Sequence, residues 1–77
     1  MSRMYLVTFS KAGDGNFREQ EYTFAGTKRA ATGRAYAKLR DRIGTRADHA
    51  FEDGIQHVPY LERGLLVKRL RERHGVS

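Results

Sequence analysis

"YTFAGTKRAATGRAYAKLRDRIG", residues 22–44, decides the fold, because it holds the end of a strand, a break and a helix with both caps. Gly26 and Thr27 interrupt the strand-like residues before them. The hydroxyl of Thr27 can accept a hydrogen bond from an amide of the first helical turn. We predict a helix from there to about Ile43. Gly44 is the residue type that closes such a helix in a left-handed conformation.

The predicted helix has one apolar stripe. At about 100° per residue, Thr32, Tyr36, Leu39 and Ile43 share one side, with Ala35 beside them. We expect this stripe to pack on the strands that precede the helix.

A separate basic row makes this helix the first candidate binding site. Arg34, Lys38 and Arg42 recur every fourth residue, which sets three cations along one edge at steps of about 6 Å. Such spacing suits successive anionic groups. Lys28, Arg29, Arg40 and Arg46 extend the charge around the helix. The alternative, given equal weight, is that arginine, lysine and alanine are strong helix formers on a solvated face.

The residues before the helix predict a β-hairpin. Residues 3–10, RMYLVTFS, alternate at the period of a strand, and residues 17–24, FREQEYTF, resume strand-like composition. Between them, KAGDGN supplies residues that tolerate a positive φ in a turn.

Two expectations follow for the faces of this hairpin. Antiparallel pairing is expected to place Tyr22 and Phe24 on the side of Tyr5, Val7 and Phe9. Glu19 and Glu21 alternate onto one face with Phe17 and Thr23, and two carboxylates disfavour that face as a reader of a phosphate-lined DNA groove.

Downstream, the pattern predicts one or two helical turns over residues 47–53, ended by Gly54. Pro59 suits the first position of a C-terminal helix that continues to Gly75. A short third strand over residues 65–70 is the alternative. The expected fold class is therefore α+β, of order ββα(α)α, with the hairpin packed by a basic helix and a C-terminal helix.

Length and composition set the function class. The chain has 77 residues, a net charge of +6 and no cysteine, which indicates one domain, residues 1–77, stabilised by packing alone. The opening apolar run is too short for a signal peptide or a membrane span, so we expect a cytoplasmic protein.

The charge is arranged in blocks. Residues 27–46 carry seven basic side chains and one acidic one, and residues 47–62 carry four acidic and no basic ones. We expect the acidic block to fold back as a partial counter-charge. A second candidate nucleic-acid-binding cluster follows near the end of the chain: Lys68, Arg69, Arg71 and Arg73.

No arrangement of residues predicts catalysis. His49 and Asp53 have i, i+4 spacing that could hold a metal on a helix, but two ligands do not make a site, and a solvated helix end is the favoured interpretation. No nucleophile–histidine–acid set or phosphate-binding glycine motif is recognisable. We expect a binding module that is not an enzyme and has no cofactor.

"YLVTF", a glycine-rich turn and "EYTFAGTKRAATGRAYAKL" together resemble the hairpin-then-helix layout of the arm-binding domains of phage integrases. The layout is also similar to that of some small anti-CRISPR proteins of phages. The resemblance covers about residues 4–43 and implies an accessory protein of a mobile element.

Two functions remain open at this point. The leading one is binding to nucleic acid or a nucleoprotein complex through the helix-borne cations, favoured by the net positive charge. The alternative is a phage-type inhibitor or adaptor that grips a host protein with exposed apolar residues such as Met4, Leu6 and Phe17, or Leu61 and Leu65. A homodimer is a further expectation, because a two-stranded sheet is marginal alone.

Overall fold

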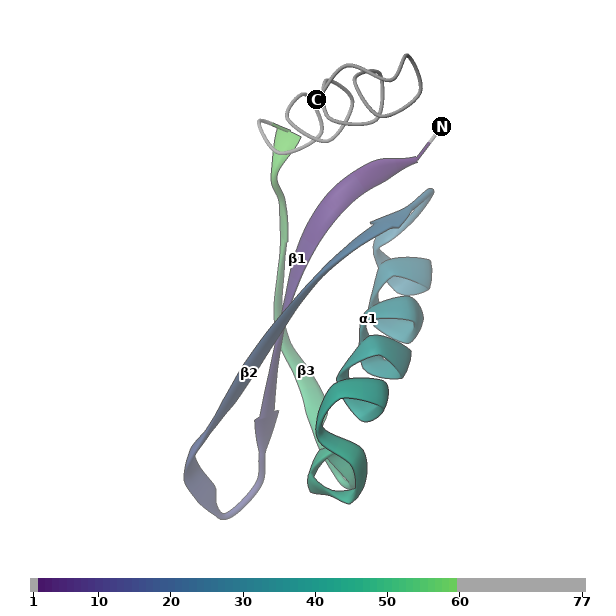
Figure 1. The fold of residues 1–77 in the computed structure, drawn as a ribbon. Helices are drawn as coiled ribbons and strands as arrows, with labels where there is room; N and C mark the ends of the chain where they lie inside the picture. The colour runs from purple at the N-terminus through teal and green to yellow at the C-terminus, as the bar shows by residue number, and fades with distance from the viewer. Residues whose placement is uncertain (1, 60–77) are drawn as a thin grey trace, which may run out of the picture.

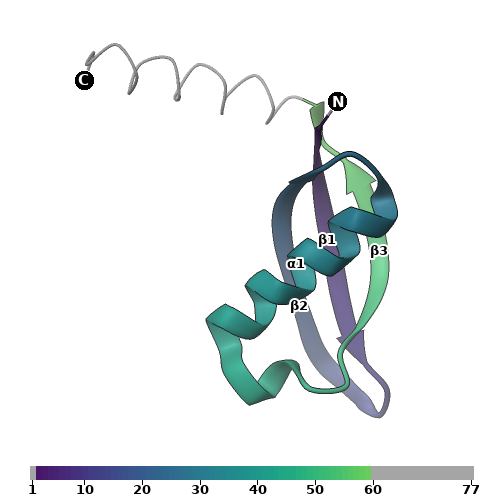
Figure 2. The ribbon, with the colours of Figure 1, turned by 90° about the vertical axis from the view of Figure 1, so that its right-hand side faces the viewer.

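The computed structural model describes residues 2–59 and shows a three-stranded antiparallel sheet with one helix on one face (Figures 1 and 2). β1 (Arg3–Lys11) and β2 (Asp14–Ala25) form the predicted hairpin, and α1 (Lys28–Ile43) follows as predicted. The α+β class is therefore confirmed. No helix in this part of the chain is long and apolar enough to cross a membrane.

Several predictions lie outside the described residues. They are the C-terminal helix beyond Pro59, its alternative strand over residues 65–70, the apolar residues Leu61 and Leu65, and the cations Lys68, Arg69, Arg71 and Arg73.

Both caps of α1 are the predicted ones. The Oγ1 atom of Thr27 accepts a hydrogen bond from the Ala30 amide at 3.1 Å. Gly44 has a φ of 61°, and its amide donates to the carbonyl of Arg40. Because a side chain rarely adopts such a φ, glycine is the residue that ends the helix here at least cost.

The prediction of a helical turn over residues 47–53 was wrong. A 3-10 helix, η1 (Gly44–Ala47), is followed by a turn at His49 and then by β3 (Phe51–His57), which pairs antiparallel with β1. The strand order is β2-β1-β3. With three strands and a helix, the sheet no longer needs a second copy of the chain to reach a stable size.

The register of the hairpin also differs from the expectation. Tyr5 lies opposite Thr23, and Val7 lies opposite Glu21, so Tyr22 and Phe24 project from the other face. The cause is an irregularity beside the turn, where Lys11 pairs with Asp14 but Ser10 pairs with Arg18. Between these two pairs β2 has three residues and β1 has none. Because three is an odd number, each β2 side chain beyond the irregularity projects from the face opposite to the one that the pairing at the turn predicts.

The core lies between α1 and the sheet. Ala31, Ala35 and Leu39 form the fully buried stripe of the helix and face Val7 and Phe9. Tyr36, Ile43 and Ile55 are partly buried beside them. The stripe is narrower than predicted and is shifted toward the alanines, which let the helix approach the sheet closely.

Candidate nucleic-acid interface

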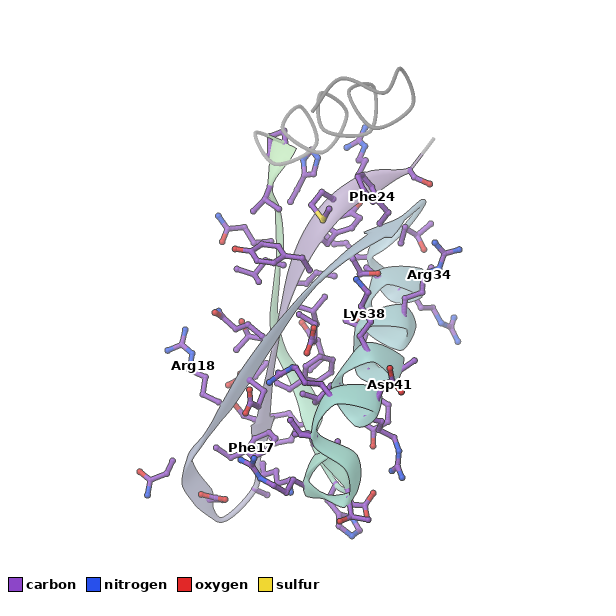
Figure 3. All side chains as sticks on the ribbon, viewed as in Figure 1. Phe17, Arg18, Phe24, Arg34, Lys38 and Asp41 are labelled. Carbon is purple, nitrogen blue, oxygen red and sulfur yellow. The ribbon has the colours of Figure 1, made fainter. Side chains whose placement is uncertain are left out.

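The basic row of α1 lies against the free edge of β2. Nη1 of Arg34 donates to the Phe24 carbonyl at 2.8 Å, and Nζ of Lys38 donates to the Tyr22 carbonyl at 2.7 Å. Figure 3 shows both side chains on α1 beside this strand. Carbonyls two residues apart point to the same side of a strand, here away from β1. The two cations therefore cover an edge that is otherwise open to pairing with another chain.

Arg42, the third member of the row, is bound by carboxylates. Its Nε donates to Oε1 of Glu21 at 2.7 Å and its Nη2 to Oε2 of Glu19 at 2.9 Å. The hydrogen bond to Glu21, followed by the one to Glu19, holds the pKa of Arg42 above its usual value. Nη2 of Arg46 lies 4.0 Å from the same Glu19. The charges of Arg42 and Arg46 are thus balanced by those of Glu19 and Glu21.

The acidic block reaches α1 at one point only among the described residues. Asp48 forms an ion pair with Arg40, and contact with the Tyr36 hydroxyl, then with Asp48, raises the pKa of Arg40. Asp53 instead accepts a hydrogen bond from Ser10 Oγ at 2.7 Å, and Glu52 accepts one from the amide of Gly54. The expected counter-charge therefore acts on Arg40 and leaves Arg34 and Lys38 untouched.

The cations of α1 and η1 consequently divide into two groups. Lys28, Arg29, Arg34 and Lys38, here called the N-terminal cation group, form no ion pair with a carboxylate of residues 2–59. Arg40, Arg42 and Arg46, the paired cation group, each lie against an acid. Free positive charge is therefore concentrated on the N-terminal part of the helix, residues 28–38.

No local pattern in the sequence indicates this division. Glu21 and Glu19 precede Arg42 by 21 and 23 positions, so the helical spacing of the cations contains no information about them. Only the three-residue irregularity in β2 places these carboxylates on the face that α1 covers.

The sheet face away from α1, here called the open face, is not covered by any element of residues 2–59 (Figures 1 and 2). Of the apolar residues expected to be exposed, Met4 and Phe17 are buried and Leu6 is half-buried. The large exposed apolar residues are instead Tyr22 and Phe51, at 46% and 48% exposure. Their register partners, Leu6 and Ser10, place both on the open face.

The weak metal hypothesis has no helix to support it. His49 lies in a turn with a φ of 66°, and Asp53 lies in β3, so their i, i+4 spacing does not bring them to one helical face. Within residues 2–59 no group of three possible metal ligands occurs.

Comparison of the chain with protein-family models, with curated proteins and with solved structures found no match. The features of the described residues that bear on function are the N-terminal cation group and the open face.

Proposed function

We propose that this domain is a non-catalytic cytoplasmic module that binds nucleic acid, alone or within a nucleoprotein complex, through the N-terminal cation group. The observation that carries the proposal is the absence of carboxylate partners for Lys28, Arg29, Arg34 and Lys38 within the described part of the chain. Cations that are not neutralised by the protein release counterions from a polyanion when it binds.

The carbonyl contacts support rather than oppose this role. A neutral carbonyl leaves the charge of Lys38 and Arg34 intact, and each side chain keeps further N–H donors for phosphate. Because both side chains are already held beside β2, less conformational entropy is lost when they bind.

In this proposal Arg42 and Arg46 play a different part from the one expected. Their charges are met by Glu19 and Glu21, so they fix α1 on the sheet instead of contacting phosphate. No asparagine or glutamine lies on α1, so the contacts of the helix are to phosphates and carry little sequence preference. It stays a prediction that a second cluster contributes to nucleic-acid binding, namely Lys68, Arg69, Arg71 and Arg73.

The test uses fluorescence anisotropy to measure the affinity of the full chain for a short DNA duplex at a series of salt concentrations. Lys38→Gln and Arg34→Gln are each expected to lower the slope of log affinity against log salt by about 0.9. The matched control is the double variant Arg42→Gln/Glu21→Gln, which keeps the net charge and is expected to keep the slope. Absence of binding at low salt would rule the proposal out.

The alternative of a phage-type inhibitor or adaptor is favoured by one observation, the exposure of Tyr22 and Phe51 on the open face. Retention of a single host protein after nuclease treatment and a high-salt wash would support it. Origin in a mobile element, and a homodimer, stay predictions.

A further inference from the structure

We propose that the nucleic acid is single-stranded, with its backbone along the free edge of β2 and a base stacked on Tyr22. This inference rests on the proposed function and names the class of nucleic acid that the same site takes.

Tyr22 joins the cations to the open face. Its carbonyl accepts the hydrogen bond from Nζ of Lys38 at 2.7 Å, while its side chain projects from the open face and is 46% exposed. Arg34 is held in the same way two residues further along, at the carbonyl of Phe24. A phosphate that contacts Lys38 is therefore within one side-chain length of an exposed aromatic ring.

The surroundings of Tyr22 suit a base. Its partner across the sheet is the half-buried Leu6, and Gln56 of β3 lies on the far side of Leu6. Toward the hairpin tip, Gln20 donates to Thr8 Oγ1 at 3.1 Å. Arg18 projects from β2 on the side away from α1 (Figure 3). Apolar contact, amide groups and a cation are the elements that bind an unpaired nucleotide.

A duplex does not fit this arrangement. Stacking on an aromatic side chain requires a base whose face is free, whereas the bases of a duplex are stacked on each other. The duplex can still contact the N-terminal cation group through its phosphates. The inferred site therefore predicts two contributions to affinity. Stacking on Tyr22 favours single strands, whereas the charge of the N-terminal cation group acts on single strands and duplexes alike and does not depend on Tyr22.

Phe51 provides an internal control. It is exposed to the same degree on the same face, but its partner Ser10 is four residues along β1 from Leu6, about 13 Å away. Glu52 and Asp53 follow it, and the Asp53 carboxylate lies on the open face against Ser10. These acids repel a phosphate backbone, so Phe51 is not expected to stack a base.

The experiment compares a 12-nucleotide oligothymidylate with a 12-base-pair duplex by fluorescence anisotropy at low salt, using the full chain. Tyr22→Ala is expected to weaken binding to the single strand about tenfold and to leave duplex binding unchanged. Tyr22→Phe, which keeps the ring, and Phe51→Ala are expected to retain the affinity of the unchanged protein.

The outcomes separate the two proposals. Binding of both probes with no effect of Tyr22→Ala would overturn the stacking site and leave the proposed function standing. Failure to bind either probe at low salt would overturn the proposed function itself. A third outcome is that neither probe binds, that the unchanged protein retains a host protein after nuclease treatment, and that Tyr22→Ala and Phe51→Ala both fail to retain it. The open face is then a protein-docking surface, and both proposals are wrong.

Discussion

The N-terminal part of α1, residues 28–38, and its C-terminal part, residues 39–43, both carry arginines and differ in their surroundings. In the N-terminal part, Arg34 and Lys38 donate to backbone carbonyls of β2 and keep their charge. In the C-terminal part, Arg42 lies between Glu19 and Glu21 and is neutralised. One row of cations at constant spacing thus contains both a candidate binding surface and a set of structural ion pairs. The helical spacing determines where the cations lie on α1, and the neighbouring strand β2 determines whether each cation is neutralised.

The largest expected effect comes from truncating the buried side chain that holds both parts of α1 on the sheet. Leu39 is the largest fully buried side chain of α1, and Leu39→Ala is expected to lower the free energy of unfolding by about 2–5 kcal/mol. Urea denaturation measures the loss. The matched variant Leu39→Met conserves volume and is expected to cost less than about 1.5 kcal/mol. Equal losses for the two variants would contradict the packing described for this stripe.

A smaller change acts on the N-terminal part of α1 alone. Thr27→Ala removes the hydrogen bond to the Ala30 amide and is expected to cost about 1 kcal/mol of unfolding free energy. Because Lys28 and Arg29 lie in that first turn, affinity for duplex DNA is expected to fall as well. Thr27→Ser keeps the hydroxyl and serves as the control. An unchanged urea midpoint in Thr27→Ala would show that the cap is not needed.

The smallest effect distinguishes the two kinds of contact directly. Arg42→Gln removes interactions between full charges, which salt screens, so its loss of stability is expected to shrink between 0.05 and 1 M salt, as the Debye length falls to about 3 Å. Lys38→Gln removes a contact with a neutral carbonyl, and its loss is expected to change less. Urea midpoints at both salt concentrations measure the difference. Equal salt sensitivity of the two variants would contradict the distinction between the two parts of α1.

Local signals were enough to predict α1 and the hairpin. Thr27, Gly44 and the helical period act within a few residues, and the observed helix begins and ends where they indicate. β3 could not be found this way, because Phe51–His57 contains two acids and a glycine, which are poor strand formers. Its strand conformation depends on pairing with β1, far away in the sequence.

The candidate site was predictable only in part. The row of Arg34, Lys38 and Arg42 was visible as a pattern, but the partners of each cation were not. The turn alone, with Lys11 opposite Asp14, predicts a register in which Tyr22 and Phe24 face the helix. The irregularity in β2 reverses this, and it brings Glu19 and Glu21 to Arg42 while it sends Tyr22 to the open face.

The small side chains beneath α1 have an effect beyond the core. Ala31 and Ala35 are fully buried, and their size sets how far the helix axis stands from the sheet. At this height the stems of Lys38 and Arg34 reach over β2 to its outer carbonyls. A valine at either position would raise the helix and pull both cations away from that edge. In the proposed binding mode, affinity for a polyanion thus depends in part on two buried alanines that the ligand does not contact.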